Sequence, residues 1–455
     1  MRTHEHIAKV VKAYDVRGVV GEDIDEALVF DVAQSFARQL REEAETTIAV
    51  GHDMRPSSPA LAAAFARGAQ AQGINVIELG LTATDELYFA AGSFGCAGAM
   101  FTASHNPARY NGIKLCRRGA RPVSQDTGLA TIAKDLVAGV PAYSGAPGKA
   151  EQRDVLDDYA SFLRGLVDVT SSRPLRIAVD AGNGMAGLTV PAVLDQENFD
   201  IRELYFELDG TFPNHEANPL DLKNLVDLQR FVVAEGADIG LAFDGDADRC
   251  FVVDELGNPV SPSAICGIIA ENYLAEHPGA TIIHNLITSQ AVPEIIQENG
   301  GTPVRTRVGH SYIKATMAST GAVFGGEHSA HYYFTEFFNA DSGLLAALHV
   351  LQALGGQDQP LSQLISRFER YVASGEINST VSDQAAATGK VHDAFADRAA
   401  DIDLLDGLTV RLKNSKSWFN VRPSNTEPLL RLNVEAASQA EVDELAEEVL
   451  GIIRG

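Results

Sequence analysis

A serine stands in a short segment whose neighbours could make its hydroxyl reactive. Ser104 lies in residues 102–107, which read Thr-Ala-Ser-His-Asn-Pro, and Asn-Gly follows at 111–112. Proline ends a regular ladder and Asn-Gly favours positive φ, so we expect a tight turn that presents the hydroxyl. A neutral hydroxyl needs a base, a lowered pKa or a metal to act as a nucleophile, and His105 and Lys114 are close by in the sequence. Taken alone, such a segment is more often a hydrogen-bonded turn than an active site.

Three aspartates alternate with small residues in a second segment. Asp244, Asp246 and Asp248 would face one side of an extended chain. Their charges repel unless a divalent cation holds them, and an all-oxygen set is typical of Mg²⁺ or Ca²⁺ and not of zinc. The simpler alternative is a solvated acidic turn. An EF-hand is excluded because Arg249 takes the position that needs glycine, and the flanking residues read as strands and not as helices.

Two further polar segments have the chemistry of sugar and phosphate recognition. Residues 326–331, Gly-Glu-His-Ser-Ala-His, place a carboxylate near a hydroxyl, which suits the closely spaced hydroxyls of a sugar. Residues 422–428, Arg-Pro-Ser-Asn-Thr-Glu-Pro, offer a guanidinium for bidentate phosphate recognition and successive backbone N–H groups for an anion nest. A polar turn would explain either segment taken alone. The interpretation therefore depends on finding all four segments in one chain.

Together, the four segments resemble the α-D-phosphohexomutase family, most closely its phosphomannomutase branch. They occur in the family's order, and the resemblance runs from about Tyr14 to the C-terminus. It implies an intramolecular phosphotransferase that interconverts mannose 6-phosphate and mannose 1-phosphate. The reaction would need Mg²⁺ and would pass through a phosphoserine at Ser104 and a hexose 1,6-bisphosphate, which serves as intermediate and activator.

The resemblance also implies roles for individual residues. The metal ligands would be Asp244, Asp246, Asp248 and a phosphate oxygen on Ser104. The catalytic residues would be Ser104, His105, Lys114, Arg17, Arg249 and His331, with the general acid and base left open among Lys114, His105 and His331. The substrate would be bound by Tyr14, His310, Glu327, Ser329, Arg422, Ser424, Asn425 and Thr426. The C-terminal domain is expected to close over the substrate, because water would otherwise compete as acceptor.

Two departures from the family pattern bear on these roles. Residues 284–288 read His-Asn-Leu-Ile-Thr where many relatives have a lysine, so one sugar or phosphate contact is absent or supplied differently. Ala247 stands where the aspartate loop of the family usually has glycine. The second change replaces one small residue by another, and we expect little effect from it.

The sequence is also compatible with several different functions. Residues 182–187, Gly-Asn-Gly-Met-Ala-Gly, follow a predicted strand, with Asp200 and Glu203 at about the spacing of a ribose-binding acid, so the pattern allows an NAD-dependent dehydrogenase. The family has a similar Gly-Asn-Gly turn, which is structural there. The serine and aspartate segments would equally suit a serine phosphatase or a non-catalytic sugar-phosphate binding protein. Within the family, a phosphoglucomutase or dual-specificity mutase and, less favoured, a phosphoglucosamine mutase would carry the same segments.

Repeated strand, loop, helix and strand patterns set the predicted fold. They occur at 47–79, 175–206 and 280–307, with apolar strands typical of sheets that are buried on both faces. We expect three similar α/β domains with mixed, mostly parallel sheets and a smaller C-terminal α+β domain around a central cleft, with boundaries at 1–149, 150–256, 257–373 and 374–455. In the last domain we expect strands at 376–381, 408–413, 418–422 and 429–434, and helices at 390–400 and from 438 onward.

Composition limits the class of partner. The chain has 455 residues, 45% of them hydrophobic, and a formal net charge of -25, which disfavours nucleic acid and anionic membranes as partners. Basic residues must therefore gather locally if the ligand is a hexose phosphate. The four cysteines have no metal or redox spacing, and the N-terminus has no apolar targeting segment. These features predict a cytoplasmic enzyme that is a monomer or a weak dimer.

Overall fold

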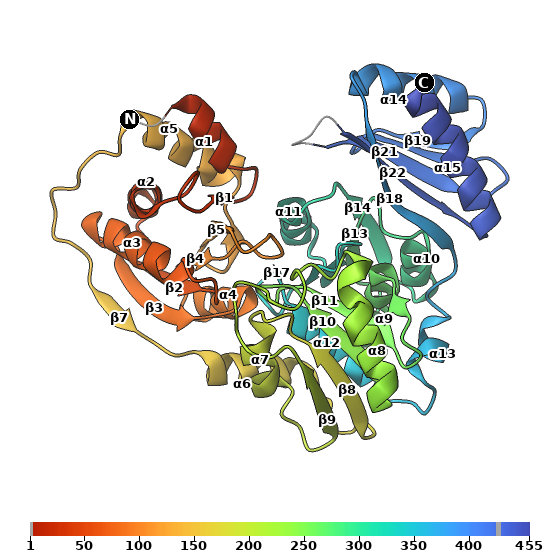
Figure 1. Ribbon diagram of the computed structural model, residues 1–455, viewed down its shortest axis with the longest axis horizontal. Coiled ribbons are helices and arrows are strands. Elements are labelled where there is room, and N and C mark those ends of the chain that lie inside the picture. The colour runs from red at the N-terminus through yellow and green to blue at the C-terminus, as the bar shows by residue number, and fades with distance from the viewer. Residues whose placement is uncertain (1–2, 425–428) are drawn as a thin grey trace.

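The computed structural model describes residues 3–424 and 429–455, and these form four consecutive units that we call domains I to IV. Domains I, II and III pack together, and domain IV, the blue unit of Figure 1, lies on the far side of α10 and α11 from domain I. The chain ends lie on opposite sides of the molecule in this view, N in domain I and C in domain IV. The expected fold class, three mixed-sheet α/β domains followed by a smaller C-terminal domain, is confirmed.

Domain I has a sheet in the order β1-β5-β4-β2-β3-β7, with β6 paired to β5. Its elements are α1 (His4–Val10), β1 (Val16–Val19), α2 (Glu26–Glu42), β2 (Thr47–His52), α3 (Ser58–Ala71), β3 (Asn75–Leu81), α4 (Thr84–Ser93), β4 (Ala97–Phe101), β5 (Tyr110–Arg117), β6 (Arg121–Pro122), the π-helical turn η1 (Gln125–Leu129), α5 (Ala130–Ala138) and β7 (Ala150–Gln152). The last strand pairs with β3. The exposed segment before it therefore leads back into the first sheet and not directly into domain II.

Domains II and III repeat the same plan with five strands each, in the orders β12-β11-β10-β8-β9 and β14-β13-β15-β16-β17. Domain II contains α6 (Leu156–Leu166), β8 (Leu175–Asp180), α7 (Ala186–Val193), β9 (Phe199–Leu204), the 3₁₀ turn η2 (Leu222–Leu225), α8 (Val226–Glu235), β10 (Ile239–Phe243), β11 (Cys250–Asp254) and β12 (Pro259–Val260). Domain III contains α9 (Pro262–Glu276), β13 (Thr281–Asn285), α10 (Ala291–Glu298), β14 (Thr302–Thr306), α11 (His310–Thr320), β15 (Phe324–Gly326), β16 (Tyr332–Phe334), β17 (Ala340–Asp341), α12 (Gly343–Gly355) and α13 (Leu361–Ile365).

Each of these three sheets changes from parallel to antiparallel pairing at one strand. β4, β10 and β15 are parallel to the strand on one side and antiparallel to the next strand in sequence, β5, β11 and β16. β4 and β10 are buried at every position, as expected of strands covered on both faces. The connection that follows the change of direction therefore starts at the carboxyl end of a buried strand in all three domains.

Domain IV is built on an antiparallel sheet in the order β18-β22-β21-β20-β19. Its elements are β18 (Val372–Thr380), α14 (Gln384–Phe395), β19 (Ala399–Asp403), β20 (Leu408–Leu412), β21 (Trp418–Pro423), β22 (Leu429–Ala436) and α15 (Gln439–Arg454). The prediction of a helix at 390–400 was wrong in position, because α14 ends at Phe395 and residues 399–403 form a strand against β20. The serine N-cap of the last helix is confirmed, since the Ser438 side chain accepts from the backbone N–H of Glu441.

Domain IV has an apolar core of its own, apart from the core that joins the other three domains. One cluster of buried side chains runs continuously through domains I, II and III, from Met100 through Phe243 to Phe324. Domain IV has its own cluster, which includes Phe395 and Phe419. The four cysteines are buried and unpaired. None of the helices in the described ranges is both long and apolar enough to span a membrane.

Candidate active site

The residues singled out from the sequence lie on three equivalent connections. Ser104 follows β4, the aspartates follow β10, and residues 327–331 follow β15. Each connection leads from the strand where its sheet changes direction into the antiparallel neighbour. Ligands of α/β sheets collect at the carboxyl ends of strands, and here three such ends converge.

The serine loop is a tight turn, as the sequence predicted. Ser104 adopts φ 49, and its backbone N–H donates to the hydroxyl of Thr102 at 2.9 Å. Only 5% of Ser104 is exposed. Its hydroxyl lies 2.7 Å from Oδ2 of Asp244 and 3.3 Å from Nδ1 of His105. The turn therefore directs the hydroxyl toward the aspartate loop (residues 244–248) of domain II.

A buried arginine that sequence reasoning missed holds this turn. Arg55, on the connection after β2, donates to the carbonyl oxygens of Ser104 at 2.8 Å and Asn106 at 2.7 Å. It also donates to those of Pro107 and Tyr110, both at 3.0 Å, and pairs with Asp53 at 3.2 Å. Five donors in a fixed planar fork can satisfy this many acceptors at once. No motif marks Arg55, because its partners are backbone carbonyls.

The three aspartates form a compact set of oxygen ligands. One carboxylate oxygen from each of Asp244, Asp246 and Asp248 lies within 4.8 Å of the other two, and all three residues are buried. The expected extended segment was wrong, since these residues form a turn. Ala247 has φ 61, the left-handed region that favours glycine, which explains the preference for glycine at this point of the loop. The carboxylates converge because the chain turns, and not because of strand alternation.

Unsatisfied oxygens in this set match a hard divalent cation. The Oδ1 atoms of Asp246 and Asp248 are buried and have no hydrogen-bond partner among the described residues. Buried acceptors without partners are costly, and oxygen-only ligands suit Mg²⁺. Their other oxygens are held by Lys114, whose Nζ lies 2.7 Å from Asp246 and 2.5 Å from Asp248. The residues present thus fit a magnesium site.

The local charges keep Asp246 ionised. Burial raises the pKa of this carboxyl, but Lys114 and a hydrogen bond from Thr84 outweigh burial and hold the pKa well below its usual range. Burial and the neighbouring Asp246 raise the pKa of Asp248 to about 7. Burial lowers the pKa of Lys114, but both carboxylates raise it well above its ordinary value. Asp246 is therefore the carboxylate of the set that stays ionised.

Arg249 and Arg17 supply positive charge near the serine. Arg249 is buried and contacts Asp244 through Nε at 3.0 Å and Nη2 at 2.9 Å. Arg17 pairs with Asp15 at 2.6 Å and donates to Asn106 of the serine loop. These are the local basic residues that the strongly acidic chain was expected to gather.

These side chains border one cavity of about 800 Å³ at the junction of domains I, II and III. Its lining includes Tyr14, Arg17, Ser104, His105, Lys114, Asp248, Arg249, His331 and Asp341. The structure thus brings the predicted serine, basic and histidine residues together. Asp341, at the end of β17, was missed, and it pairs with the buried Lys314 at 2.7 Å.

The residues of the predicted sugar loop (327–331) differ in what they contact. His331 lines the cavity, its Nδ1 lies 3.0 Å from the hydroxyl of Ser329, and burial lowers its pKa to about 4. Both carboxylate oxygens of Glu327 are engaged within the protein, one with Tyr333 at 2.7 Å and the other with Asn285 and Gly309. Asn285 thus occupies the region where a lysine was noted as absent. His310 starts α11, and its side chain lies outside the described part of the structure.

The phosphate-loop residues lie on domain IV, at the end of β21. Arg422 pairs with Glu376 at 3.0 Å, and Ser424 donates its backbone N–H to Leu429 at 2.8 Å. Asn425 and Thr426 lie outside the described residues. Of the predicted substrate-binding residues whose side chains the structure describes, Tyr14 borders the cavity around Ser104, and Glu327, Ser329, Arg422 and Ser424 do not. Tyr14 reaches from domain I toward domain III, with its ring 6.3 Å from that of Tyr312.

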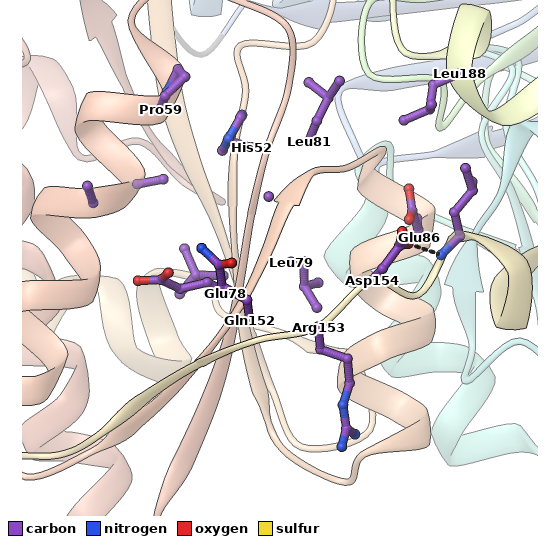
Figure 2. Close-up of a pocket in the computed structure, with 15 residues that line it drawn as sticks. His52, Pro59, Glu78, Leu79, Leu81, Glu86, Gln152, Arg153, Asp154 and Leu188 are labelled. Carbon is purple, nitrogen blue, oxygen red and sulfur yellow. Dashed lines mark hydrogen bonds between the residues drawn. The ribbon is translucent and has the colours of Figure 1, made fainter.

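A second cavity, of about 630 Å³, lies where domain I meets α7 of domain II. Figure 2 shows its carboxylates Glu86 and Asp154 close together, with the side chain of Arg153 directed away from them.

The Gly-Asn-Gly turn at residues 182–184 borders neither this cavity nor the one around Ser104. A Cβ on Gly184 would lie 2.8 Å from the carbonyl oxygen of Gly245, so this glycine allows close packing against the aspartate loop.

Ser104 beside the buried aspartates, at the junction of three repeated α/β domains with a fourth domain beyond, is the arrangement expected of the phosphohexomutase class of enzyme. Comparison with known proteins agrees. The four phosphoglucomutase/phosphomannomutase family models match in order: domain I at 8–138, domain II at 157–257, domain III at 261–371 and the C-terminal domain at 376–452. The chain belongs to this family, and the protein is an intramolecular phosphotransferase.

Curated relatives and a solved structure cover nearly the whole chain. A phosphomannomutase of Salmonella typhimurium is 39% identical over 434 residues, 93% of this chain and 94% of that protein. A protein of Xanthomonas campestris named phosphohexose mutases is 40% identical over 449 residues, 98% of this chain and 99% of its own. The crystal structure of a phosphoglucomutase/phosphomannomutase family protein from Burkholderia thailandensis has a TM-score of 0.90 at 31% identity, and covers 100% of this chain and 98% of that one.

Proposed function

We propose that the protein is a phosphomannomutase that interconverts mannose 6-phosphate and mannose 1-phosphate. The observation that carries the proposal is the hydroxyl of Ser104 at 2.7 Å from Asp244, within a set of carboxylates that has unsatisfied oxygens. The relatives named phosphomannomutase support the choice of mannose. A dual phosphomannomutase/phosphoglucomutase is the second candidate, because the names of the relatives extend to phosphohexose mutases in general.

The proposed reaction transfers a phosphoryl group twice. Ser104 starts as a phosphoserine, the bond between its Oγ and phosphorus breaks, and a bond forms from phosphorus to the free O1 or O6 of the sugar phosphate. The product of this step is hexose 1,6-bisphosphate. After the bisphosphate turns over in the cavity, Oγ of Ser104 accepts the other phosphoryl group, and the remaining monophosphate is released. A catalyst of this reaction mainly positions groups and neutralises charge.

The basic residues around the serine would neutralise the transferred group. Arg249 and Arg17 border the same cavity as Ser104, and Lys114 is an ammonium held by two carboxylates, so its role is that of a fixed charge. Mg²⁺, held by Asp244, Asp246, Asp248 and a phosphate oxygen on Ser104, would supply further charge stabilisation when bound.

Proton transfer at the sugar oxygen needs a group near the serine. His105 lies 3.3 Å from the hydroxyl of Ser104, and His331 borders the same cavity from domain III. We propose the two histidines as the acid and base in preference to Lys114, because the lysine is committed to its two ion pairs. Single replacement of each histidine by glutamine, followed by measurement of kcat against pH, separates their contributions.

Domain IV would complete the substrate site by moving. Arg422 and Ser424 do not border the cavity that contains Ser104, although they are the expected phosphate ligands. We propose that domain IV rotates about the chain at the start of β18, where the pairing with β22 is irregular between Ala373 and Glu376. Cross-linking domain IV to domain III in the present arrangement is expected to abolish turnover, and undiminished activity would exclude closure.

Mass spectrometry of the isolated protein and a coupled assay test the proposal together. We expect a phosphate on the peptide that contains Ser104, and turnover of mannose 1-phosphate faster than that of glucose 1-phosphate or glucosamine 1-phosphate. Ser104→Ala should remove both the phosphate and the turnover. Steady release of inorganic phosphate would identify a serine phosphatase instead, and sugar-phosphate binding without phosphate on Ser104 would identify a binding protein.

A further inference from the structure

The first turn of α4 contacts the aspartate loop directly. Thr84, the first residue of this domain I helix, donates its hydroxyl to Oδ2 of Asp246 at 2.5 Å and its backbone N–H to the carbonyl oxygen of Asp246 at 3.1 Å. Both residues are fully buried. The contact joins positions 162 residues apart, and it joins domain I to domain II. Together with the contacts from Ser104 to Asp244 and from Lys114 to Asp246 and Asp248, it means that domain I contacts all three aspartates.

The contact determines which way the carboxylate of Asp246 faces. Its Oδ2 accepts from both Thr84 and Lys114, whereas its Oδ1 is buried without a hydrogen-bond partner in the described part of the chain. The lysine is shared with Asp248, so its flexible side chain alone does not fix the rotation of Asp246. Thr84 is fixed by its helix and bonds Asp246 at two points. The oxygen left over is the one available to a cation.

The same turn is anchored on its other sides. Asp85 accepts at Oδ2 from the hydroxyls of Tyr159 in α6 and Ser342 at the start of α12, both at 2.7 Å. Glu86 accepts from the backbone N–H of Ala83 at 3.1 Å, and its side chain borders the second cavity in Figure 2. The turn is therefore tied to domains I, II and III at once. Thr84 has little freedom to move away from the aspartate loop.

We propose that Thr84 is a positioning residue for the divalent-cation site and sets the affinity of that site by orienting Asp246. The inference rests on the proposed function, because it takes the aspartates as metal ligands. The three aspartates all belong to domain II, whereas Thr84 belongs to domain I. The proposal therefore adds that cation binding requires domain I to be docked on domain II. Groups that orient a metal ligand in this way typically change metal affinity by about 10- to 100-fold when they are removed.

Thr84→Val tests the proposal, because valine keeps the shape of the side chain and has a methyl group in place of the hydroxyl. The full chain is titrated with Mg²⁺ alone, and binding is followed by calorimetry and by the rise in Tm. We expect the Kd for Mg²⁺ to rise at least tenfold in Thr84→Val and to stay within about threefold of the unaltered chain in Thr84→Ser, which keeps the hydroxyl. Saturating Mg²⁺ should restore most of kcat. Thr84→Cys, with a weak donor of similar size, replaces the valine variant if that variant does not fold.

Thr189→Val is the matched control, because Thr189 is equally buried and its hydroxyl donates within its own helix, to Met185. This variant should leave the Kd for Mg²⁺ unchanged. Unchanged affinity in folded Thr84→Val, or equal weakening in Thr84→Ser, would overturn the proposal. The two proposals are separable. If Thr84→Val binds Mg²⁺ more weakly but the unaltered chain has no mutase turnover, the proposed function is refuted and the role of Thr84 stands. If Thr84→Val binds Mg²⁺ normally and the unaltered chain is a working mutase, the role of Thr84 is refuted and the proposed function stands.

Discussion

The hydroxyl of Ser104 donates to Oδ2 of Asp244 across 140 positions of sequence and across the boundary between domains I and II. Phosphorylation of this oxygen would replace a hydrogen-bond donor with a group of charge about -1.5 to -2 beside a buried carboxylate. Arg249, which pairs with the same Asp244, offsets only part of that charge. The phosphorylated and unphosphorylated proteins must therefore differ in their need for a cation.

We predict that removal of Mg²⁺ destabilises the phosphorylated protein more than the unphosphorylated one. A ligand at 100 times its Kd stabilises the folded state by about 2.7 kcal/mol, and the larger anionic charge tightens cation binding. The measurement is thermal unfolding of the two separated forms with Mg²⁺ and with chelator. Ser104→Ala should behave as the unphosphorylated form does. Equal shifts in Tm for both forms would contradict the prediction.

Lys114→Met should destabilise the protein and make it more responsive to Mg²⁺. The ammonium group is the shared partner of Asp246 and Asp248, and loss of one partner from a buried ion pair costs about 3–5 kcal/mol. A bound cation would replace part of the lost charge. Denaturant unfolding with and without Mg²⁺ should show a larger stabilisation in the variant than in the unaltered chain. A smaller stabilisation would mean that Lys114 helps to hold the cation and does not merely compensate for its absence.

Arg55→Lys should lower kcat far more than it changes KM. Lysine keeps the charge next to Asp53 but cannot reach the four carbonyl oxygens that Arg55 satisfies around the serine turn. We expect a loss of about 2–4 kcal/mol in stability and a fall in kcat of about 100-fold from displacement of Ser104. Steady-state kinetics and denaturant unfolding measure the two effects.

Arg67→Lys is the control for that substitution. Arg67 pairs with Glu26 on the surface, and both side chains are 58% exposed. Exposed ion pairs contribute little, so stability should change by less than about 0.5 kcal/mol and kcat should not change. A fall in kcat of similar size in both variants would show that the effect of Arg55→Lys is not specific to the serine turn.

The sequence predicted the loops that carry the site better than the residues that hold them in place. Ser104 and Asp244 could be expected to meet, because each follows an apolar strand in a repeated α/β unit. Arg55 and Thr84 could not, because the partners of Arg55 are backbone carbonyls 49 to 55 residues away and Thr84 bonds a side chain in another domain. Such contacts depend on how domains dock, and no local pattern records them.

The misplaced helix of domain IV has two causes. Asp383 as N-cap and the alanines at 385–387 favour the earlier start that α14 takes, so the late start of the predicted helix overlooked a local signal. Residues 399–403 instead complete the edge of the sheet against β20. Pairing with a neighbouring strand decided the conformation of this segment, and local preference did not.

Glu86→Gln should remove part of the pH dependence of stability. Burial raises the pKa of this carboxyl to about 8, above its ordinary value of 4.5. The stabilising contribution of the bound proton is complete below pH 4.5 and is lost as the pH rises toward 8, by up to about 1.4 kcal/mol per pH unit. Glutamine can still accept from Ala83 but does not titrate.

The measurement is Tm as a function of pH for Glu86→Gln and the unaltered chain. The gain in Tm from the substitution should grow between pH 5 and pH 8. Glu78→Gln is the comparison for the loss of one carboxylate, because Glu78 borders the same cavity but is only partly buried. A gain that stays constant over this pH range would contradict the assignment of a raised pKa to Glu86.

Arg422 and Arg431 lie directly opposite each other on β21 and β22, and Glu376 on β18 contacts both, at 3.0 Å and 3.4 Å. Like charges in this cross-strand position repel, so the carboxylate serves as their shared counter-ion while no phosphate is bound. Glu376→Gln removes that negative charge and leaves both guanidinium groups available. We therefore expect the variant to be less stable by about 0.2–1 kcal/mol and to bind inorganic phosphate more tightly. Calorimetric titration with phosphate should give a Kd several-fold lower than that of the unaltered chain, with a steeper dependence on salt.

Two further variants show whether this effect belongs to the arginine pair. Arg422→Gln in the Glu376→Gln background should abolish the gain in phosphate affinity, because a single guanidinium then remains. Glu441→Gln, on the exposed start of α15, changes the net charge by the same amount at a distance from the pair and should leave phosphate binding unaltered. If Glu441→Gln tightened phosphate binding as much as Glu376→Gln, the gain would reflect the overall charge of -25, and Glu376 would have no specific role in domain IV.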